Sequence, residues 1–432
     1  MTYLEALERV EETKKYGSVP GLESITELMH RLGDVENQIP VIHIGGTNGK
    51  GSVGAMVEQA LRQAGYMTGR YASPAVFEYR EMIQRNGQLI SEEDFADCAD
   101  RVFAACEEMT AQGLPHPTSF EVETAIAFVY FAAMPCDAVL LEVGMGGRLD
   151  ATNLINKPVC SVITTISMDH MAFLGDSLPS IAMEKAGIIK RGCPVVSAMQ
   201  KPEVLEVIHE RAATLAAPLW IADPQELTDC VYDLRGMEFK RRGIPYHLSL
   251  VGSAQLQNVS CALQTLEVLQ EDCGYEKLTV ENVSQAMAKV HWPGRFEVIK
   301  EDPLVVIDGA HNEDAALKLR KTVENCFTNR RITYIIGVLA DKEYEKILQI
   351  MLPLAERVYT VTPNSPRALP AEKLAEAAAH YHDQVIAVDS PAEAYRMARQ
   401  TCNEENVILA FGSLSYLKEI VNESNCSEQL CQ

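Results

Sequence analysis

Short apolar runs alternate with longer helical patterns through most of this 432-residue chain. In the first part, strands are expected at 40–44, 137–143, 159–165 and 194–198, and helices at 52–65, 92–111, 119–133, 178–190 and 202–215. Strands that alternate with helices require crossover connections, which place the strands parallel and the helices on the faces of the sheet. The sequence therefore predicts an α/β fold whose core is a doubly wound, mostly parallel sheet.

A second alternating series follows the Trp292–Pro293–Gly294 hinge, with a hairpin expected before it at 237–250. Its expected strands are 303–307, 332–337, 356–361, 385–388 and 406–411, and its expected helices are 312–327, 343–352, 370–380 and 391–402. Because the chain is too long for one ordinary core, we expect two domains. These are a larger domain over 1–295 and a smaller Rossmann-like domain over 296–432, the latter of ordinary domain size.

Composition narrows the class of protein. Sixty acidic residues against 38 basic ones give a net charge of −22, which disfavours nucleic acid or an anionic membrane as a partner. No apolar run approaches the ~20 residues that a membrane helix needs, and the first twenty residues lack the apolar core of a signal peptide. Twelve cysteines without a C-x-x-C pair fit a reducing compartment. We expect a cytoplasmic monomer that acts on small molecules.

The stretch GGTNGKGS, residues 45–52, lies between an expected strand and an expected helix. Backbone N–H groups of such a turn and the helix start can bind phosphates, while a lysine reaches the outer phosphates. The common pattern G-x-x-x-x-G-K-[ST] needs glycine at 44 and a hydroxyl at 51. Here Ile44 and Gly51 occupy those positions, and the hydroxyl comes one residue later at Ser52. The spacing alone leaves a phosphate loop and a simple turn both open.

Polar residues follow several expected strands, where ligands bind in open α/β sheets. Glu142 ends a buried strand before a glycine turn; it could hold Mg²⁺, act as a base, or cap the turn. His170 follows another expected strand, and it is either a functional residue or a core or surface histidine without such a role. Asp308 and His311 follow a strand of the second series. Lys185 lies on a mostly apolar helix face, where a lysine that reaches along the apolar surface to solvent, or a surface ion pair, is the plainer interpretation.

Together these segments resemble the folylpolyglutamate synthase/dihydrofolate synthase family of the Mur ligase superfamily. The resemblance covers nearly the whole chain, and it is carried by PGLESITELMHRLG, GGTNGKGSV, YASP, TSFEVETAIAF, LEVGMGGRLDATN, DHMAFLGDSLPSIAMEKAGIIK, PGRFEVI, IDGAHN, GVLADKE and FGSLSYL. It implies a phosphate loop with one inserted glycine, and an ATP-dependent ligase. ATP would convert a folate or dihydropteroate carboxylate to an acyl phosphate, which the amine of L-glutamate then attacks.

The resemblance also implies roles for individual residues. Lys50, Lys185 and His311 would be catalytic, with Lys185 carried as a carbamate. Mg²⁺, in two sites, would be held by Ser73, Glu142 and His170. ATP would be bound by Thr47, Asn48, Gly49, Lys50, Gly51, Ser52, Asn258, Arg295 and Asp308. The acceptor, the incoming glutamate or its intermediate would be bound by Ser24, Thr118, Phe120, Glu121, Leu149, Asp150, Ala151 and Ser413.

Two positions depart from the family pattern. Ala75 stands where the family often has histidine, and Met82 stands where it commonly has arginine, with Arg80 as a candidate replacement. Two other functions stay open beside the folate ligase. Another Mur-type amino-acid ligase would share the chemistry, but PGLESI and SFEVETA argue against it. A P-loop ATPase without ligase activity would have no use for Asp308 and His311.

Overall fold

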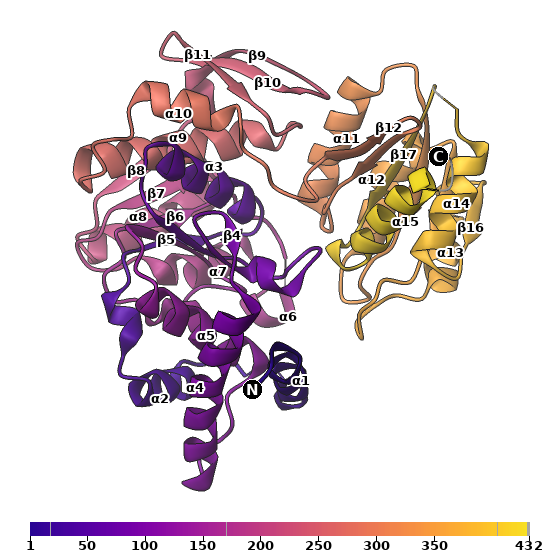
Figure 1. Ribbon diagram of the computed structural model, residues 1–432. Helices are drawn as coiled ribbons and strands as arrows, with labels where there is room; N and C mark the ends of the chain where they lie inside the picture. The colour runs from indigo at the N-terminus through magenta and orange to yellow at the C-terminus, as the bar shows by residue number, and fades with distance from the viewer. Residues whose placement is uncertain (18, 170, 404, 430–432) are drawn as a thin grey trace. The chain divides into compact units, whose positions relative to one another are not determined.

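The computed structural model describes residues 1–17, 19–169, 171–403 and 405–429. These residues form two compact units, each with its own sheet and core (Figure 1). The first unit comprises Met1–Ile166, Met171–Pro224 and Gln257–Ala286. The second comprises Gln225–Leu256, Met287–Gln432 and a short segment that begins at Ser167. The units are therefore not two continuous stretches of chain, and a domain boundary at residue 295 stays a prediction.

The first unit is built on an eight-stranded sheet, in the order β4-β3-β2-β5-β1-β6-β7-β8. These strands are β1 (Val41–Gly45), β2 (Thr68–Tyr71), β3 (Ile83–Arg85), β4 (Gln88–Leu89), β5 (Ala138–Glu142), β6 (Cys160–Ile163), β7 (Val195–Ala198) and β8 (Leu219–Ala222). Neighbours from β2 to β8 pair in parallel, and the short β3 and β4 are antiparallel. The mostly parallel, doubly wound sheet predicted from the sequence is confirmed.

Ten α-helices accompany this sheet within the described residues. They are α1 (Tyr3–Thr13), α2 (Glu23–Arg31), α3 (Lys50–Gln63), α4 (Glu92–Ala111), α5 (Ser119–Ala133), α6 (Met171–Leu174), α7 (Leu178–Lys185), α8 (Pro202–Thr214), α9 (Gln255–Asp272) and α10 (Val280–Met287). The expected helix over 178–190 is wrong in its second half, because α7 ends at Lys185. A Cβ at Gly187 would lie 2.4 Å from the Cβ of Arg148, so the chain there needs glycine.

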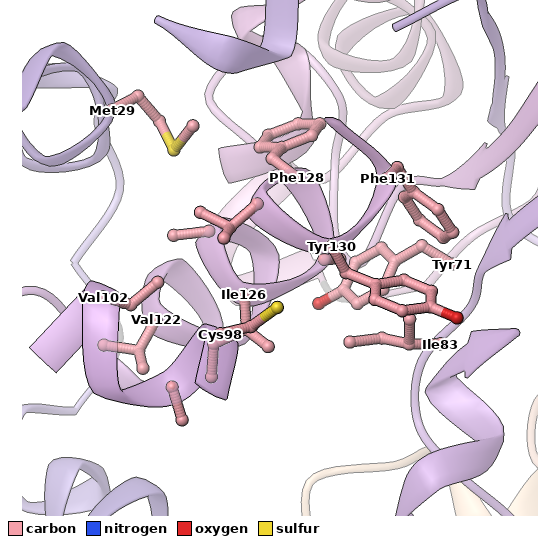
Figure 2. Packing of buried hydrophobic residues seen from close by; sticks show 14 of the residues in the cluster. Met29, Tyr71, Ile83, Cys98, Val102, Val122, Ile126, Phe128, Tyr130 and Phe131 are labelled. Atoms are coloured by element: carbon pink, nitrogen blue, oxygen red, sulfur yellow. The ribbon is translucent and has the colours of Figure 1, made fainter. Parts of the chain in front are cut away.

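The main core of the first unit surrounds α5, which packs against α1, α2 and α4. Its side chains from Val122 to Phe131 are buried except at Glu123, so this helix has no solvent face of its own. Figure 2 shows Ile126, Phe128 and neighbouring apolar side chains filling the space between these elements. Burial on every side explains why the sequence here reads as a continuous apolar run and lacks an amphipathic pattern.

The second unit contains a six-stranded sheet, in the order β12-β13-β17-β14-β15-β16. Its strands are β12 (Glu297–Glu301), β13 (Leu304–Ile307), β14 (Arg331–Ile336), β15 (Arg357–Thr360), β16 (Val385–Ala387) and β17 (Asn406–Phe411). All neighbours are parallel except β12, an antiparallel edge strand. The accompanying helices are α11 (Glu313–Cys326), α12 (Tyr344–Met351), α13 (Ala371–Ala378), α14 (Pro391–Thr401) and α15 (Leu417–Gln429).

A separate three-stranded antiparallel sheet completes the second unit. The predicted hairpin is present as β10 (Gly236–Arg241) and β11 (Ile244–Leu248), and β9 (Leu227–Asp233) adds an unpredicted third strand. Within the part of the chain that the structure describes, no helix has both the length and the apolar character that crossing a bilayer requires.

Candidate functional site

The glycine-rich loop joins the end of β1 to the start of α3, as the sequence predicts. Two of its glycines are required by both conformation and space. Gly46 has φ of +142° and a Cβ there would lie 2.0 Å from Thr164 Oγ1; Gly49 has φ of +91° and a Cβ there would lie 2.2 Å from Asn258 Oδ1. Asn258, on α9, is therefore packed against the loop, where the resemblance places it in an ATP site.

The backbone of the loop is anchored by the segment that follows β6. The amides of Thr47 and Asn48 both donate to the carbonyl of Thr165, at 2.9 and 3.1 Å. Since these two amides are engaged, the N–H groups best placed for phosphate are those at the start of α3, where Lys50 is the first helical residue. Ser52 is buried in the same first turn.

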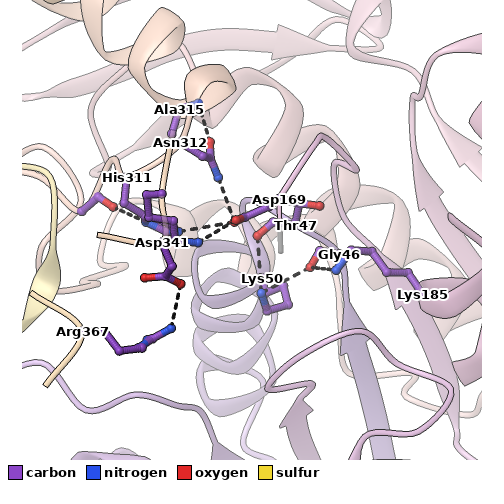
Figure 3. Close-up of polar contacts among 12 residues, drawn as sticks. Gly46, Thr47, Lys50, Asp169, Lys185, His311, Asn312, Ala315, Asp341 and Arg367 are labelled. Carbon is purple, nitrogen blue, oxygen red and sulfur yellow. Dashed lines mark hydrogen bonds and ion pairs between the residues drawn. The ribbon is translucent and has the colours of Figure 1, made fainter. Parts of the chain in front are cut away.

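Lys50 and Glu142 meet at the carboxyl ends of two adjacent strands. Ile44 of β1 pairs with Glu142 of β5 in parallel register, which brings the loop and the carboxylate to the same edge. Lys50 Nζ lies 3.9 Å from Glu142 Oε1, and their side chains are 17% and 14% exposed. The ammonium also lies 3.3 Å from the Gly46 carbonyl and 3.4 Å from the Thr47 carbonyl (Figure 3). Two polar residues that the sequence places next to expected strands, Lys50 and Glu142, therefore lie close together.

Lys185 belongs to the same site, and its interpretation as a surface ion pair is wrong. Its side chain is buried, with the residue only 4% exposed, and its Nζ donates to the Gly46 carbonyl at 2.9 Å (Figure 3). The neighbouring Glu184 instead pairs with Arg148, whose Nη2 lies 2.9 Å from Glu184 Oε1. Arg148 also donates its backbone N–H to the Glu184 carbonyl at 2.7 Å, so the glycine turn after Glu142 is fastened to the end of α7.

The expected Mg²⁺ ligands are only partly described. His170 lies outside the described residues, while Ser73 follows β2, whose Tyr71 pairs with Leu141 beside Glu142. Among the described residues, no three His, Cys, Asp or Glu side chains gather as a metal-binding group. Mg²⁺ commonly keeps waters and phosphate oxygens and takes only one or two carboxylates. A single carboxylate held 3.9 Å from the ammonium of Lys50 fits that kind of site.

In the second unit, the expected residues gather around Gly309. A Cβ at Gly309 would lie 2.2 Å from Arg295 Nη1 and 2.7 Å from Leu414 Cδ2, next to Ser413. Asp308, at the end of β13, accepts hydrogen bonds from the amides of Phe296 and Ala310, both at 2.8 Å. Burial raises the pKa of the Asp308 carboxyl, and the nearby Arg295 guanidinium opposes that shift.

His311 leads to a cluster that the sequence did not single out. Its Nδ1 lies 2.8 Å from the Gly309 carbonyl, and its Nε2 lies 3.7 Å from Asp169 Oδ2. Asp169 Oδ1 also accepts from Lys342 Nζ at 2.6 Å. Asn312 Nδ2 donates to Asp169 Oδ2 at 3.3 Å (Figure 3). Lys342 and Asp169 are each 8% exposed. Both residues lie in segments that carry the family resemblance, so the resemblance is the sequence signal that could have identified them.

Several expected substrate-binding side chains have structural roles. Thr118 and Glu121 form a capping box at the start of α5, with the Thr118 amide 2.7 Å from Glu121 Oε2. Asp150 is buried, and its two oxygens accept from the Met145 amide at 2.8 Å and from the Thr152 amide and hydroxyl at 3.0 and 2.5 Å. Burial raises the pKa of Asp150. These hydrogen bonds engage the carboxylates of Glu121 and Asp150 within the protein. A direct part of either residue in substrate binding stays a prediction.

Other expected substrate residues are better placed for a ligand. The hydroxyl of Ser24 is buried and has no hydrogen-bond partner among the described residues. Phe120 packs over the glycine turn, since a Cβ at Gly144 would lie 2.5 Å from its Cζ. Leu149 is 36% exposed and Ala151 is 5% exposed on the same turn. Ser413 caps the short 3₁₀ turn Leu414–Tyr416, its Oγ accepting from the Ser415 amide at 3.3 Å.

One of the two departures from the family pattern, Met82, has a local explanation, and nothing in the structure explains Ala75. Met82 is buried in the main apolar core, where a guanidinium would need partners that a core lacks. Arg80, the candidate replacement for an arginine at 82, is engaged by local partners, and its part in substrate binding stays a prediction. Its Nε donates to Glu78 Oε1 at 2.6 Å, its Nη1 donates to the Ile90 carbonyl, and its guanidinium lies over the ring of Tyr3.

Comparison with known proteins identifies the class. Residues 44–266 match the Mur ligase middle domain, and residues 294–414 match the Mur ligase glutamate ligase domain. The fold and the P-loop site thus define a Mur ligase. The dihydrofolate synthase/folylpolyglutamate synthase of Bacillus subtilis is 34% identical over 430 residues, which cover 97% of this chain and 98% of that protein.

Solved structures of folylpolyglutamate synthases have the same fold as this chain. A Mycobacterium tuberculosis folylpolyglutamate synthase complexed with ADP and AMPPCP has a TM-score of 0.86 and 31% identity, and the match covers 98% of each chain. Escherichia coli FolC in complex with DHPP and ADP has a TM-score of 0.85 and 28% identity, over 100% of this chain and 99% of the other. The chain belongs to the folylpolyglutamate synthase/dihydrofolate synthase family of Mur ligases.

Proposed function

We propose that this chain is an ATP-dependent ligase that joins L-glutamate to a folate or dihydropteroate carboxylate, forming an amide, ADP and phosphate. The observation that carries the proposal is the meeting of the loop lysine, Lys50, with Glu142 and Lys185 around one glycine-rich loop. Relatives that match this chain nearly end to end bear the names of that activity. Structures with ADP among them support ATP as the co-substrate.

The chemistry explains why cations gather at the loop. A carboxylate is a poor electrophile, so it is first phosphorylated by ATP to an acyl phosphate, which the amine of glutamate attacks with release of phosphate. Phosphoryl transfer depends on positioning and on neutralising charge. Lys50 would face the outer phosphates, and Ser52 and the first amides of α3 would hold the inner ones. Asn258 supports the loop that carries them.

We propose Mg²⁺ as the resident metal, held by Glu142, Ser73 and His170. When bound, the ion would neutralise phosphate charge and orient its oxygens. Lys185 would act in this site as a carbamate. Its amine is buried beside the loop and 2.9 Å from the Gly46 carbonyl. A carbamate there would replace a buried cation with an anion whose oxygens suit a hard metal.

In the second unit, we propose that Arg295 and Asp308 contact the nucleotide. His311 and Ser413 would contact the incoming glutamate or the intermediate. His311 is held through Nδ1 by the Gly309 carbonyl, and its Nε2 lies near Asp169. The Lys342–Asp169 ion pair keeps that carboxylate in place. Substitutions at His311 should therefore change the second half of the reaction, glutamate attack, more than acyl phosphate formation.

We also propose that the protein acts as a monomer in the cytoplasm, on small molecules and not on nucleic acid. The eleven described cysteines are all free, which supports a reducing compartment. The net charge of −22 opposes binding to nucleic acid.

The test is ADP release with purified protein, ATP and L-glutamate, with dihydropteroate or tetrahydrofolate as acceptor. Release that requires an acceptor and glutamate, with an acceptor product that gains one glutamyl residue by mass spectrometry, supports the proposal. ADP release that ignores both would indicate a P-loop ATPase. Ligation of glutamate or another amino acid to a non-folate carboxylate only would indicate a different Mur-type ligase.

A further inference from the structure

The carboxylate of Glu123 stands out within the most apolar helix of the molecule. Between Val122 and Phe131 of α5 it is the only charged residue, and the only residue of that stretch that is not fully buried. Its one hydrogen bond among the described residues comes from the Tyr79 hydroxyl, whose oxygen lies 2.7 Å from Glu123 Oε1. A carboxylate offers about four acceptor positions on its two oxygens, so the described protein groups fill only part of its accepting capacity.

Glu123 is held in a mostly dehydrated place. Burial raises the pKa of its carboxyl, while the Tyr79 hydrogen bond and the charge of Lys14 lower it, and Glu11 raises it. Burial also raises the pKa of Tyr79 well above its ordinary value, so the hydroxyl keeps its proton and remains a donor. The Tyr79 ring is fixed edge-on against Phe95, with centroids 5.7 Å apart. A partly buried carboxylate with unused acceptors is costly unless donors are supplied to it.

The same face of α5 carries the aromatic residue expected to contact the acceptor. Phe120 lies three positions before Glu123, so the two side chains project from one side of the helix. Phe120 packs over Gly144 of the glycine turn and lies 6.4 Å from the Tyr71 ring, centroid to centroid. The Tyr71 hydroxyl in turn forms a hydrogen bond of 3.3 Å with the hydroxyl of Thr124, the residue after Glu123. A flat apolar surface and a carboxylate thus lie on one side of α5.

We infer that Glu123, oriented by Tyr79, determines specificity for the acceptor by accepting hydrogen bonds from the 2-amino group and N3–H of its pyrimidinone ring. This inference rests on the proposed folate ligase function. An aminopyrimidinone edge presents two parallel N–H donors, which match the two oxygens of one carboxylate as a guanidinium does. The glutamate tail of the acceptor is excluded from this place, because its carboxylates would be repelled by Glu123. The uncharged ring is the part of a folate that supplies donors and a flat face together.

The test compares two acceptors that differ at one position. One is a 4-oxoquinazoline folate analogue with a 2-amino group, and the other carries a 2-methyl group of similar size in its place. We expect the unaltered protein to prefer the 2-amino acceptor by about 10- to 100-fold in kcat/KM, since one charge-assisted hydrogen bond is lost with the methyl compound. The KM values for ATP and L-glutamate should be the same with either acceptor.

Glu123→Leu should reduce that preference to about twofold or less, mainly by raising the KM of the 2-amino acceptor. Tyr79→Phe removes the hydroxyl that orients the carboxylate, so its preference should lie between that of the unaltered protein and that of Glu123→Leu. Glu58→Gln is the matched control, because Glu58 is a buried carboxylate of the same unit that pairs with Arg70. It should lower stability and leave the preference unchanged.

Three results would overturn the inference. They are an unaltered protein that uses both acceptors equally, a Glu123→Leu variant with full preference, and a loss of preference in Glu58→Gln as large as in Glu123→Leu. The first needs no variant and so does not depend on the folding of one. Absence of ligation with any acceptor would instead contradict the proposed function itself.

Discussion

Replacing Lys50 with methionine keeps most of the side-chain length and removes its charge. The ammonium is held 3.9 Å from Glu142 Oε1, and its side chain is 17% exposed, so it acts in a partly dehydrated place. An ammonium and a phosphate charge ~4 Å apart attract each other by about 4 kcal/mol at an effective dielectric constant of ~20. Each ~1.4 kcal/mol lost from the transition state lowers the rate tenfold. Allowing for partial compensation by the helix N-terminus, we expect Lys50→Met to lower kcat by about 10²–10³-fold.

The assay is ADP release at saturating ATP, acceptor and L-glutamate, with urea unfolding of each variant as a check on the fold. Lys190→Met is the matched control, since Lys190 is a half-buried lysine of the same unit whose Nζ donates to the Asn153 carbonyl. It should change stability and leave kcat within a few-fold. A Lys50→Met variant that turns over at a near-normal rate would refute the reasoning, because the loop would then be only a turn.

Three further outcomes follow from particular contacts. Lys185→Ala should lose most activity. A titration with acetate should restore part of it, since a small carboxylate can replace a carbamate. Full activity without acetate would count against the carbamate. Gly49→Ala should raise the KM for ATP by about tenfold or more, because the residue has a positive φ and its new Cβ would collide with Asn258. The control Gly65→Ala should leave this KM unchanged, because Gly65 has a positive φ but open space around it. Burial lowers the pKa of His43 to about 3, so only the unfolded chain binds a proton there between pH 3 and 6.5, and stability falls as the pH falls. In His43→Gln the slope of unfolding free energy between pH 4 and 6 should decrease by about 1.4 kcal/mol per pH unit; an unchanged slope would show that His43 titrates normally.

Much of the fold could be predicted because its central strands are buried on both faces. Such strands are continuous apolar runs, and β1, β5, β6 and β7 all lie within one or two residues of their predicted positions. Two of the strands that were missed, β2 and β9, lack that signal. β2 is four residues, TGRY, with glycine and arginine at its centre, and β9 is largely exposed and reads as polar.

The candidate site was predictable only where its chemistry is local in sequence. The loop and Glu142 each adjoin a strand end, so the position of the strand predicts that of the side chain. Lys185 is different, because its partner Gly46 is 139 residues away, and no helical pattern distinguishes a buried lysine from a surface one. Asp169 and Lys342 are 173 residues apart, so only the folded chain brings them together.

The most direct test of the proposed ligase activity is ADP release measured with each substrate omitted in turn. We predict release only when ATP, L-glutamate and a folate or dihydropteroate acceptor are all present, with one glutamyl residue added to the acceptor for each ADP formed. Steady ADP release with ATP alone, and an acceptor whose mass does not change, would contradict it.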